Sequence, residues 1–392
     1  MRMRIAVLMP LNHADIQALL ENREPSMFLY RLVRVYAEEG HEIIFITSAN
    51  CIQKTIYIRH EKIRIYIVKV GRHGNLRALF RFSKEIVEMK KILRMERPDV
   101  VHAHWCYEFA MAALKYDATK SVVTLHDWPD VVCPAVGNFF WERRRKLGNN
   151  VLKRAVHVTG VSKYMASLYL DRFPDRTISI ISNFINQDIL ASENEIIRHS
   201  PTIYTICNGF GKIKNAQKAM QAFRLIRESA QNVSLVMYGD GYGEGGRASE
   251  WARENKLGDG IIFKGNKERN AVLHDLEEGG ILLHTSLTES FGMVLIEAMA
   301  KKVIVIAGKD SGAVPDVLGY GEYGILVDIN NVDEIAKCVE SVLENPDKYD
   351  YIIRKAYDYV KKEFLLDAIK DKYLCEYRKV CEREDDESFA ET

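Results

Sequence analysis

The sequence predicts an α/β protein built from two doubly wound parallel-sheet domains. Its 392 residues exceed one ordinary core, so two domains of about 150–200 residues are expected. Short, wholly apolar runs alternate with longer helical patterns, which is typical of parallel strands covered on both faces. The alternation starts afresh after Pro201, which indicates a second unit of similar size.

The first unit, residues 1–188, contains the following elements in order. Strand-like runs are "RIAVLMP", "HEIIFITS", "KIRIYIVKV", "PDVVHAHW" and "KSVVTLHD". Helical patterns between them are "SMFLYRLVRVYAEEG", which stops at Gly40, the long amphipathic "ALFRFSKEIVEMKKILRME", and "AMAALKYD". Residues 183–200 show neither the apolar runs of a strand nor the periodicity of a helix, so we expect them to connect the domains.

The second unit, residues 200–371, repeats this order. Its strand-like runs are "TIYTICN", "VSLVMYG", "GIIFKG", "ILLHTS" and "KVIVIAG", with helices over "AQKAMQAFRLIRES", "GRASEWARENKLG" and from about Phe291. Ligands of such sheets bind beyond the carboxyl ends of the strands, so we expect the two domains to face a cleft. A last helix, about 372–392, is expected to pack back on the first domain.

Composition narrows the class of protein. The chain is 47% apolar and 28% charged, and no run approaches the 18 or so apolar residues of a membrane span. The start, "MRMRIAVLMPLNH", is more typical of a buried strand than of a signal peptide. Seven cysteines without a C-x-x-C pair favour a reducing, cytoplasmic setting and argue against structural zinc or a disulfide framework.

Charge is unevenly distributed along the chain. Residues 1–190 carry 29 Lys and Arg against 19 Asp and Glu, a net of +10, whereas residues 191–392 carry 26 against 35, a net of −9. A basic half often meets an anionic surface, such as membrane phospholipid or a phosphorylated substrate. We therefore expect peripheral contact with the inner face of a membrane and no nucleic-acid partner; a solvated basic face without a partner is the alternative.

The stretch "NGFGKIKNAQKAM" follows a predicted strand and precedes a predicted helix. Gly209 and Gly211 let backbone approach a ligand, while Lys212, Lys214 and the helix start supply positive potential. This predicts a diphosphate clamp, with a plain basic turn as the alternative.

A second glycine-rich turn, "VMYGDGYGEGG", fits G-x-G-x-x-G through Gly241, Gly243 and Gly246. A dinucleotide site would place this turn after the first strand of its domain, and here it comes one strand later. A flexible turn lining a nucleotide cleft is the preferred interpretation over an NAD site.

Histidines stand at two predicted strand ends, in "HAHW" and "TLHDW". His102, His104, His126 and Asp127 together could ligate a metal, but no further ligand recurs with suitable spacing, so no metal site is expected. His126 and Asp127 are the better functional candidates, whereas a strand-end histidine is more often structural.

The stretch "TESFGMVLIEAMA" places Glu289 in a loop after a strand and Glu297 inside an apolar helix. Thr288 to Ser290 are good capping residues, and the N–H groups of Ser290, Phe291 and Gly292 favour an anion at the helix start. Glu297 requires a partner if buried. Ribose hydroxyls would suit it, and a salt bridge to a buried Lys or Arg is the alternative.

With these residues in view, the chain resembles the retaining glycosyltransferases of the GT-B fold, close to glycosyltransferase family four (glycosyl transferases group one). The resemblance covers nearly the whole length. It rests on the E-x7-E pattern of "TESFGMVLIEAMA", supported by "GHEIIFIT", "PDVVHAHW", "GVSKYM", "YGDGYG", "IIFKGN" and "GILVD". It implies two Rossmann-like domains, the first for the acceptor and the second for the nucleotide-sugar donor.

The resemblance also implies roles for single residues. Glu297 would bind ribose, Glu289 the donor sugar, and the following N–H groups the diphosphate. Lys214 would neutralise the diphosphate, and His126 would reach the donor sugar. Gly265 of "IIFKGN" would lie among the donor-binding residues. Gly209 stands where the family usually has arginine, so Lys212 would supply the second charge.

The implied reaction moves a sugar from a UDP- or GDP-sugar to an acceptor hydroxyl, with retention and without metal or cofactor. Polysaccharide, glycolipid or glycoconjugate synthesis is the expected setting. One alternative is a sugar-nucleotide epimerase, which would need further acids in the cleft. Another is a nucleotide-sugar-binding protein without transfer, suggested by the missing arginine.

Overall fold

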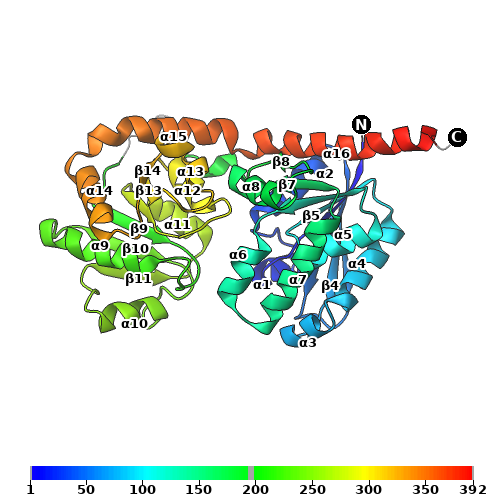
Figure 1. Cartoon of the computed structure of the whole chain (residues 1–392), viewed down its shortest axis with the longest axis horizontal. Helices are drawn as coiled ribbons and strands as arrows, with labels where there is room; N and C mark the ends of the chain where they lie inside the picture. Colours follow the sequence, from blue (N-terminus) through cyan, green and yellow to red (C-terminus); the bar gives the residue numbers. More distant parts are fainter. Residues whose placement is uncertain (1, 193–197, 391–392) are drawn as a thin grey trace. The chain divides into compact units, whose positions relative to one another are not determined.

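The computed structural model describes residues 2–192 and 198–390, and these form two α/β units (Figure 1). Unit 1 comprises Met1–Ile181 with Lys370–Thr392, and unit 2 comprises Ser182–Ile369. The predicted class, two domains with parallel sheets, is confirmed. Of the connection predicted over 183–200, residues 193–197 lie outside the described part of the chain.

Unit 1 contains an eight-stranded sheet in the order β3-β4-β2-β1-β5-β6-β7-β8. Every neighbouring pair is parallel except β3 and β4. The antiparallel edge strand β3 was not predicted, because its side chains alternate between half-buried and exposed instead of forming a buried apolar run. The strands are β1 (Arg4–Leu8), β2 (Glu42–Ala49), β3 (Ile56–His60), β4 (Ile63–Lys69), β5 (Val100–His104), β6 (Ser121–Leu125), β7 (His157–Gly160) and β8 (Ser179–Ile180).

The helices of unit 1 correct one prediction. The single helix expected over residues 78–96 is wrong: α3 ends at Leu79 and α4 begins at Ser83. Between them, Arg81 and Phe82 have φ of 51° and 58°, a left-handed conformation that cannot continue a helix. The helices are α1 (His13–Leu20), α2 (Phe28–Glu38), α3 (Gly74–Leu79), α4 (Ser83–Glu96), α5 (Glu108–Tyr116), α6 (Pro129–Val136), α7 (Phe139–Arg154), α8 (Lys163–Arg172) and most of α16 (Leu366–Ala390).

Unit 2 contains a six-stranded, fully parallel sheet in the order β11-β10-β9-β12-β13-β14. Its strands are β9 (Thr202–Ile206), β10 (Ser234–Tyr238), β11 (Ile261–Gly265), β12 (Ile281–His284), β13 (Ile304–Gly308) and β14 (Ile325–Val327). Its helices are α9 (Ala216–Ser229), α10 (Arg247–Glu254), α11 (Arg269–Leu276), α12 (Met293–Ala300), α13 (Val314–Val317), α14 (Val332–Glu344) and α15 (Asp350–Glu363).

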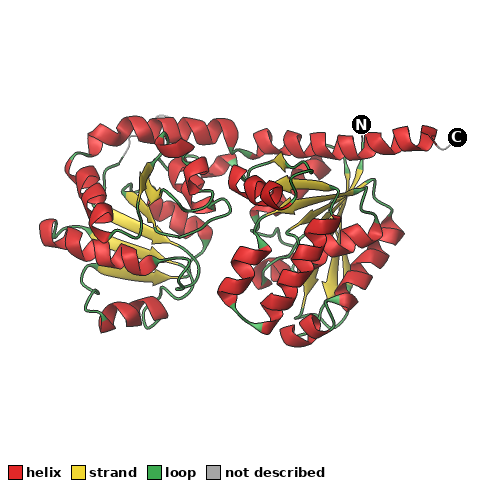
Figure 2. Ribbon diagram, viewed as in Figure 1, coloured by secondary structure: helices red, strands yellow, loops and turns green. Residues whose placement is uncertain are grey.

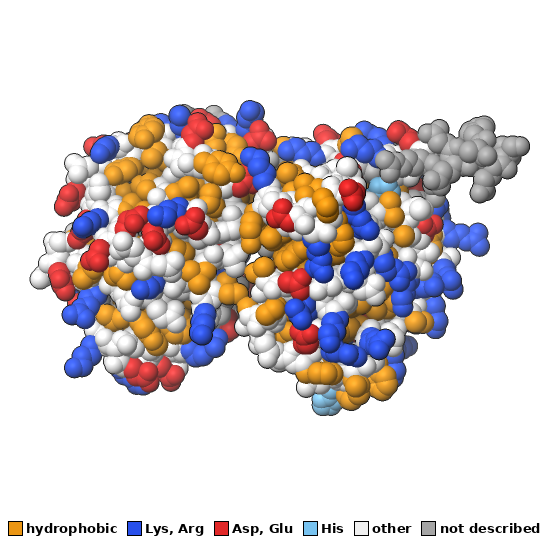
Figure 3. Space-filling view, viewed as in Figure 1, with side chains coloured by type: hydrophobic (Ala, Val, Ile, Leu, Met, Phe, Trp, Pro, Cys, Tyr) orange, Lys and Arg blue, Asp and Glu red, His pale blue; other side chains and the backbone are white. Residues whose placement is uncertain are grey.

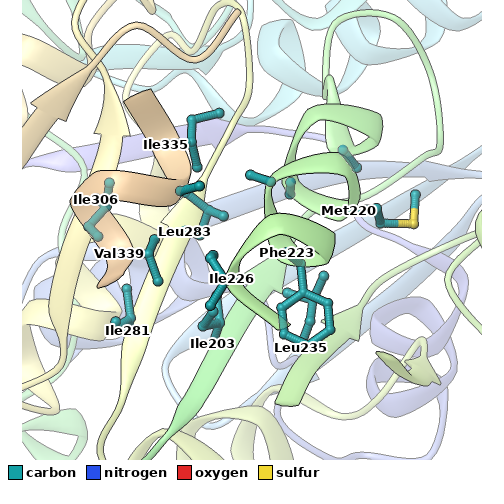
Figure 4. Close-up of a cluster of buried hydrophobic side chains, with 14 of the residues drawn as sticks. Ile203, Met220, Phe223, Ile226, Leu235, Ile281, Leu283, Ile306, Ile335 and Val339 are labelled. Carbon is teal, nitrogen blue, oxygen red and sulfur yellow. The ribbon is translucent and has the colours of Figure 1, made fainter. Parts of the chain in front are cut away.

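Helices cover both faces of each sheet, which is why the central strands are buried on both faces (Figure 2). In unit 1, every residue of β5 and β6 is buried. In unit 2, α9 and α14 pack on one face of the sheet, where Phe223, Leu283 and Val339 belong to one buried cluster (Figure 4). Burying each such side chain contributes about 1.5–3 kcal/mol, so these layers hold the strand ends in fixed register.

The described part of α16 beyond Ile369 packs within unit 1. Tyr373 and Tyr377 are buried beside His102 of β5, and the Tyr377 hydroxyl lies 2.6 Å from His102 Nδ1. Tyr36 of α2 donates a hydrogen bond to the Lys370 carbonyl at 3.0 Å. The end of the chain therefore completes the core of the first unit.

Across residues 2–192 and 198–390, no helix combines the length and the apolar character that crossing a membrane requires.

Candidate active site

The centre of the candidate site lies where β9 and β12 run side by side in unit 2. The loop after β9 carries Lys214, and the loop after β12 carries Glu289. Lys214 Nζ lies 2.7 Å from Glu289 Oε1. His284, the last residue of β12, places Nε2 3.4 Å from the same oxygen. Neighbouring parallel strands thus bring together two groups that are 75 residues apart in sequence.

The side chains around Glu289 keep it ionised. Burial alone would raise the pKa of Glu289, but the nearby His284 ring and the hydrogen-bonded charge of Lys214 outweigh the burial, so this pKa lies well below its ordinary value. Both contacts use Oε1; within the part of the chain that the structure describes, Oε2 accepts no hydrogen bond. This fixed carboxylate can therefore accept one from a sugar hydroxyl.

Backbone contacts with the segment after β13 fix the Glu289 loop. The Glu289 N–H donates to the Ser311 carbonyl at 3.3 Å, and its own carbonyl accepts from the Ala313 N–H at 2.8 Å. Gly312 makes this approach possible, because a Cβ there would lie 2.5 Å from the Glu289 carbonyl oxygen. Both backbone polar groups of Glu289 are thus hydrogen-bonded, which fixes the position from which its carboxylate extends.

Helix α12 begins later than predicted. It starts at Met293, not near Phe291, and its N-cap is Gly292 with φ of 88°, so the predicted side-chain cap from residues 288–290 is wrong. Among described residues, the N–H groups of Phe291 and Gly292 have no hydrogen-bond acceptor. The Phe291 ring packs against Phe364 at 5.6 Å. Phe291 therefore offers its backbone, not its side chain, to an anion, and Ser290 precedes it in the same turn.

Glu297 has the ionic partner that the sequence left open as an alternative. Its Oε1 accepts from Nε of Arg269, at the start of α11, at 2.7 Å, and Nη2 lies 2.5 Å away. Burial raises the pKa of Glu297, and the Arg269 charge offsets this only in part. The hydrogen bonds from described residues reach Oε1 alone, so Oε2 can accept a ribose hydroxyl.

The remaining predicted donor-site residues fall into two groups. A Cβ at Gly209 or Gly211 would meet nothing within 4 Å, and Lys212 is exposed without an ionic partner among described residues, so this loop has open space around it. At Gly265 a Cβ would lie 3.0 Å from Gly243 Cα. The absence of a side chain at Gly265 therefore makes room for protein backbone.

In unit 1 the strand-end histidines form two separate hydrogen-bonded pairs. His102 Nε2 lies 2.6 Å from Thr124 Oγ1, and His104 Nδ1 lies 2.9 Å from His126 Nε2. Burial lowers the pKa of His102 to about 3 and that of His104 well below its ordinary value, so both rings are neutral. Within residues 2–192 and 198–390, no three or more His, Cys, Asp or Glu side chains are grouped to hold a metal ion.

Next to these histidines is a cavity of about 370 Å³ within unit 1. Asp127 and Arg144 line it, with Trp105 and Trp141 among its aromatic walls. The Tyr107 hydroxyl donates to Asp127 at 2.9 Å, yet burial raises the pKa of Asp127 to about 6. The cavity thus combines a carboxylate with aromatic surfaces, which suits a polar ligand with ring-shaped apolar faces.

Sequence reasoning missed three residues of these sites. His284 stands at the end of "ILLH", so the strand-end argument applied to His126 would have found it. Arg269 and Arg144 carry no local signal, because they reach their carboxylates through tertiary packing. Arg144 pairs with the buried Glu108 at 3.1 Å.

Comparison with known proteins agrees with this geometry. Residues 26–189 match the model of "Glycosyltransferase Family 4", and residues 190–359 match "Glycosyl transferases group 1". N-acetyl-alpha-D-glucosaminyl L-malate synthase of Bacillus anthracis is 26% identical over 86% of this chain and 89% of that protein. An uncharacterized glycosyltransferase of Haemophilus influenzae is 24% identical over 80% of this chain and 84% of its own length.

Solved structures show the same fold. Sucrose-phosphate synthase from Thermosynechococcus elongatus has a TM-score of 0.74 and 16% identity, covering 96% of this chain and 99% of its own. An E. coli trehalose-6-phosphate structure bound with UDP-2-fluoro glucose has a TM-score of 0.71 and 11% identity, covering 95% and 98%.

Two parallel-sheet domains with these matches define a glycosyltransferase of the GT-B fold. The chain resembles family 4 in its first domain and group 1 in its second, as the E-x7-E stretch implied.

Proposed function

We propose that this glycosyltransferase moves a sugar from a UDP- or GDP-sugar to an acceptor hydroxyl, with retention at the anomeric carbon and without metal. The observation that carries the proposal is the Lys214–Glu289–His284 cluster at the ends of β9 and β12. A nucleotide sugar needs a cationic group at its diphosphate and a carboxylate at its sugar hydroxyls, and this cluster supplies both.

The proposed reaction exchanges one bond of the anomeric carbon for another. The bond between the anomeric carbon and the diphosphate oxygen breaks through an oxocarbenium-like state, and a bond to the acceptor oxygen forms on the same face. The acceptor proton passes to the departing phosphate. Lys214 has three N–H donors, of which one reaches Glu289, so it can also stabilise the negative charge that builds up on the diphosphate.

Two further assignments belong to this proposal. Glu297 Oε2 takes a ribose hydroxyl, and the N–H groups of Phe291 and Gly292 take diphosphate oxygens. For His126 the support is the family resemblance, which gives it a contact with the donor sugar. Polysaccharide, glycolipid or glycoconjugate synthesis is the proposed setting.

We further propose a cytoplasmic protein with peripheral contact to an anionic membrane. Across residues 2–192 and 198–390 no cysteine is joined in a disulfide, which suits a reducing compartment. The net charge of +10 in residues 1–190 supports the membrane contact.

Thermal unfolding with UDP, GDP, ADP and their sugars tests the donor. Ligand at about 100 times its Kd should add roughly 2.7 kcal/mol to the free energy of unfolding. Glu297→Ala should lose most of this gain. Glu289→Ala should keep the nucleotide response and lose sugar transfer, measured as release of nucleotide with an acceptor present.

Three outcomes would contradict the proposal. No response to any nucleotide would exclude the donor class. Equal transfer by wild type and Glu289→Ala would exclude the role of Glu289. A clear nucleotide-sugar response without transfer to any acceptor would favour a binding protein instead.

A further inference from the structure

Helix α3 turns an apolar face outward. Leu76, Leu79 and Phe80 occupy positions i, i+3 and i+4, and they are 53%, 55% and 57% exposed. A helix on a globular protein normally directs such a stripe at the core. Here Ala78 and Phe82 occupy the core instead, with 0% and 1% exposure. The outward side chains therefore do not contribute to the core, and an exposed apolar group of this kind indicates an interaction surface.

Cationic side chains surround this stripe. Residues 71–84, "GRHGNLRALFRFSK", contain four Arg and Lys and no Asp or Glu. Arg77 turns inward to Glu85, at 2.7 Å, whereas Arg72, Arg81 and Lys84 are exposed. Figure 3 shows hydrophobic side chains at the position of α3 with Lys and Arg gathered beside them.

A cationic pocket adjoins the stripe. A cavity of about 210 Å³ between the α3–α4 turn and α7 is lined by Arg81, Arg143, Lys146 and Asn150 together with the apolar Phe82 and Leu147, and none of the described carboxylates lines it. Arg143 Nε donates to the Ala78 carbonyl at 3.4 Å, and Lys146 lies 3.7 Å from Glu142, outside the pocket lining. Three cations and an amide in a hollow of this size suit a phosphate group.

A second recess deepens the apolar surface. A cavity of about 330 Å³ on α3 has Leu76, Phe80 and Phe82 among its walls, and Arg72 and Lys84 also line it. Its one carboxylate, Glu85, is paired with Arg77. Apolar walls combined with exposed cations match the boundary between acyl chains and headgroups.

We propose that α3, the α3–α4 turn and the start of α7 form a docking surface for an anionic phospholipid bilayer. Leu76, Leu79 and Phe80 enter the interfacial layer, and the pocket of Arg81, Arg143 and Lys146 receives a headgroup phosphate. A bilayer offers both an apolar layer and a layer of phosphates at its surface, which matches an outward apolar helix face beside a phosphate-sized cationic hollow. This surface rests on the membrane contact proposed above and assigns it to particular residues, and it does not depend on the proposed sugar transfer.

Flotation of the full chain with lipid vesicles tests the docking surface. Phosphatidylcholine vesicles containing phosphatidylglycerol should carry the protein, and pure phosphatidylcholine vesicles should not. Binding should weaken as ionic strength rises, because the attraction is partly electrostatic. The pair Arg81→Glu and Lys146→Glu should weaken binding at least tenfold, and the triple change of Leu76, Leu79 and Phe80 to serine should abolish it.

Matched controls separate this surface from net charge. Arg253→Glu with Lys256→Glu makes the same change of charge at exposed positions of unit 2 and should bind vesicles as wild type does. Equal loss in this control would overturn the assignment, as would wild-type flotation of the serine variant or equal binding to both kinds of vesicle.

Further arms identify the source of the phosphate. If inorganic phosphate stabilises wild type but not the Arg81, Lys146 variant, and vesicles do not bind, the pocket is a free-anion site and the proposal fails. Binding to duplex DNA that the serine variant leaves unchanged, without vesicle binding, would also overturn it. The shift in thermal unfolding on adding nucleotide, measured in the same variants, tests the donor site alone. It therefore shows whether a failure concerns the docking surface or the proposed sugar transfer.

Discussion

Glu289 lies in the loop before α12 and Glu297 lies in α12 itself, and the surroundings of the two carboxylates shift their pKa values in opposite directions. Glu289 has Lys214 and His284 beside it, and its pKa is lowered. Among the described residues Glu297 has Arg269 as its one ionic partner, and burial raises its pKa. As pH falls, Glu297 therefore takes up a proton first. Nucleotide binding should weaken on acidification before the group proposed to hold the sugar changes charge.

Arg269→Ala tests the support of Glu297. Loss of its charge should raise the pKa of Glu297 further, so nucleotide affinity should fall several-fold at neutral pH and its decline should begin at a higher pH. We also expect about 1–2 kcal/mol less stability, since a hydrogen bond to a charged group is lost. Calorimetric titration with UDP and GDP over a pH series measures both effects on binding, and urea unfolding measures the stability.

The control for Arg269 is Arg227→Ala, which removes another ion pair of unit 2, with Asp259 at 2.9 Å. Its nucleotide affinity should equal that of wild type. An unchanged affinity and pH profile in Arg269→Ala would mean that Glu297 does not depend on this partner.

Asp127→Asn should stabilise the protein in a pH-dependent way. The ordinary pKa of 3.8 is raised to about 6 in the fold, so the folded state binds the proton more tightly than the unfolded state. Wild type therefore loses stability as pH rises between these values, by at most about 3 kcal/mol. Urea unfolding should show a larger advantage of the Asn variant at pH 7 than at pH 4; a pH-independent difference would contradict this.

At the scale of elements, α12 depends on its glycine N-cap. Gly292 has φ of 88°, and a Cβ there would lie 2.9 Å from Leu295 Cδ1. Gly292→Ala should cost about 1–2 kcal/mol of stability and weaken nucleotide binding, because its N–H moves. Gly258→Ala, where a Cβ meets nothing within 4 Å, should change stability by less than about 0.5 kcal/mol.

The elements also show which features a sequence can predict. Runs such as β5 and β12 were evident because a parallel strand buried on both faces must be apolar along its length. The late start of α12 and the break at Arg81 were not, because they depend on the left-handed backbone of Gly292 and of Arg81 and Phe82, which the apolar period of the sequence does not encode.

The same distinction holds for the site. Glu289 and Lys214 were predictable from strand ends and turn composition. Their 2.7 Å contact follows from the order of β9 and β12 in the sheet, which no local pattern encodes. The pairing of Glu297 with Arg269 likewise needed the packing of α11 near α12.

At the scale of the whole molecule, α16 ties the end of the chain to unit 1. Tyr377→Phe should cost about 1–2 kcal/mol, because the buried His102 Nδ1 loses its hydroxyl partner. Urea unfolding measures the loss. Tyr351→Phe, at a side chain 61% exposed, should leave stability unchanged, and an equal effect of both would contradict the role of the buried contact.

The two-part make-up of unit 1 also has a consequence for the order of biosynthesis. Residues 182–369 form a continuous unit, whereas unit 1 needs residues from both ends of the chain. On the ribosome, the second sheet can therefore fold completely before the first domain obtains its last helix. The nascent chain would hold an unfinished amino-terminal domain, with His102 still lacking Tyr377, until the residues of α16 have been made and have reached it.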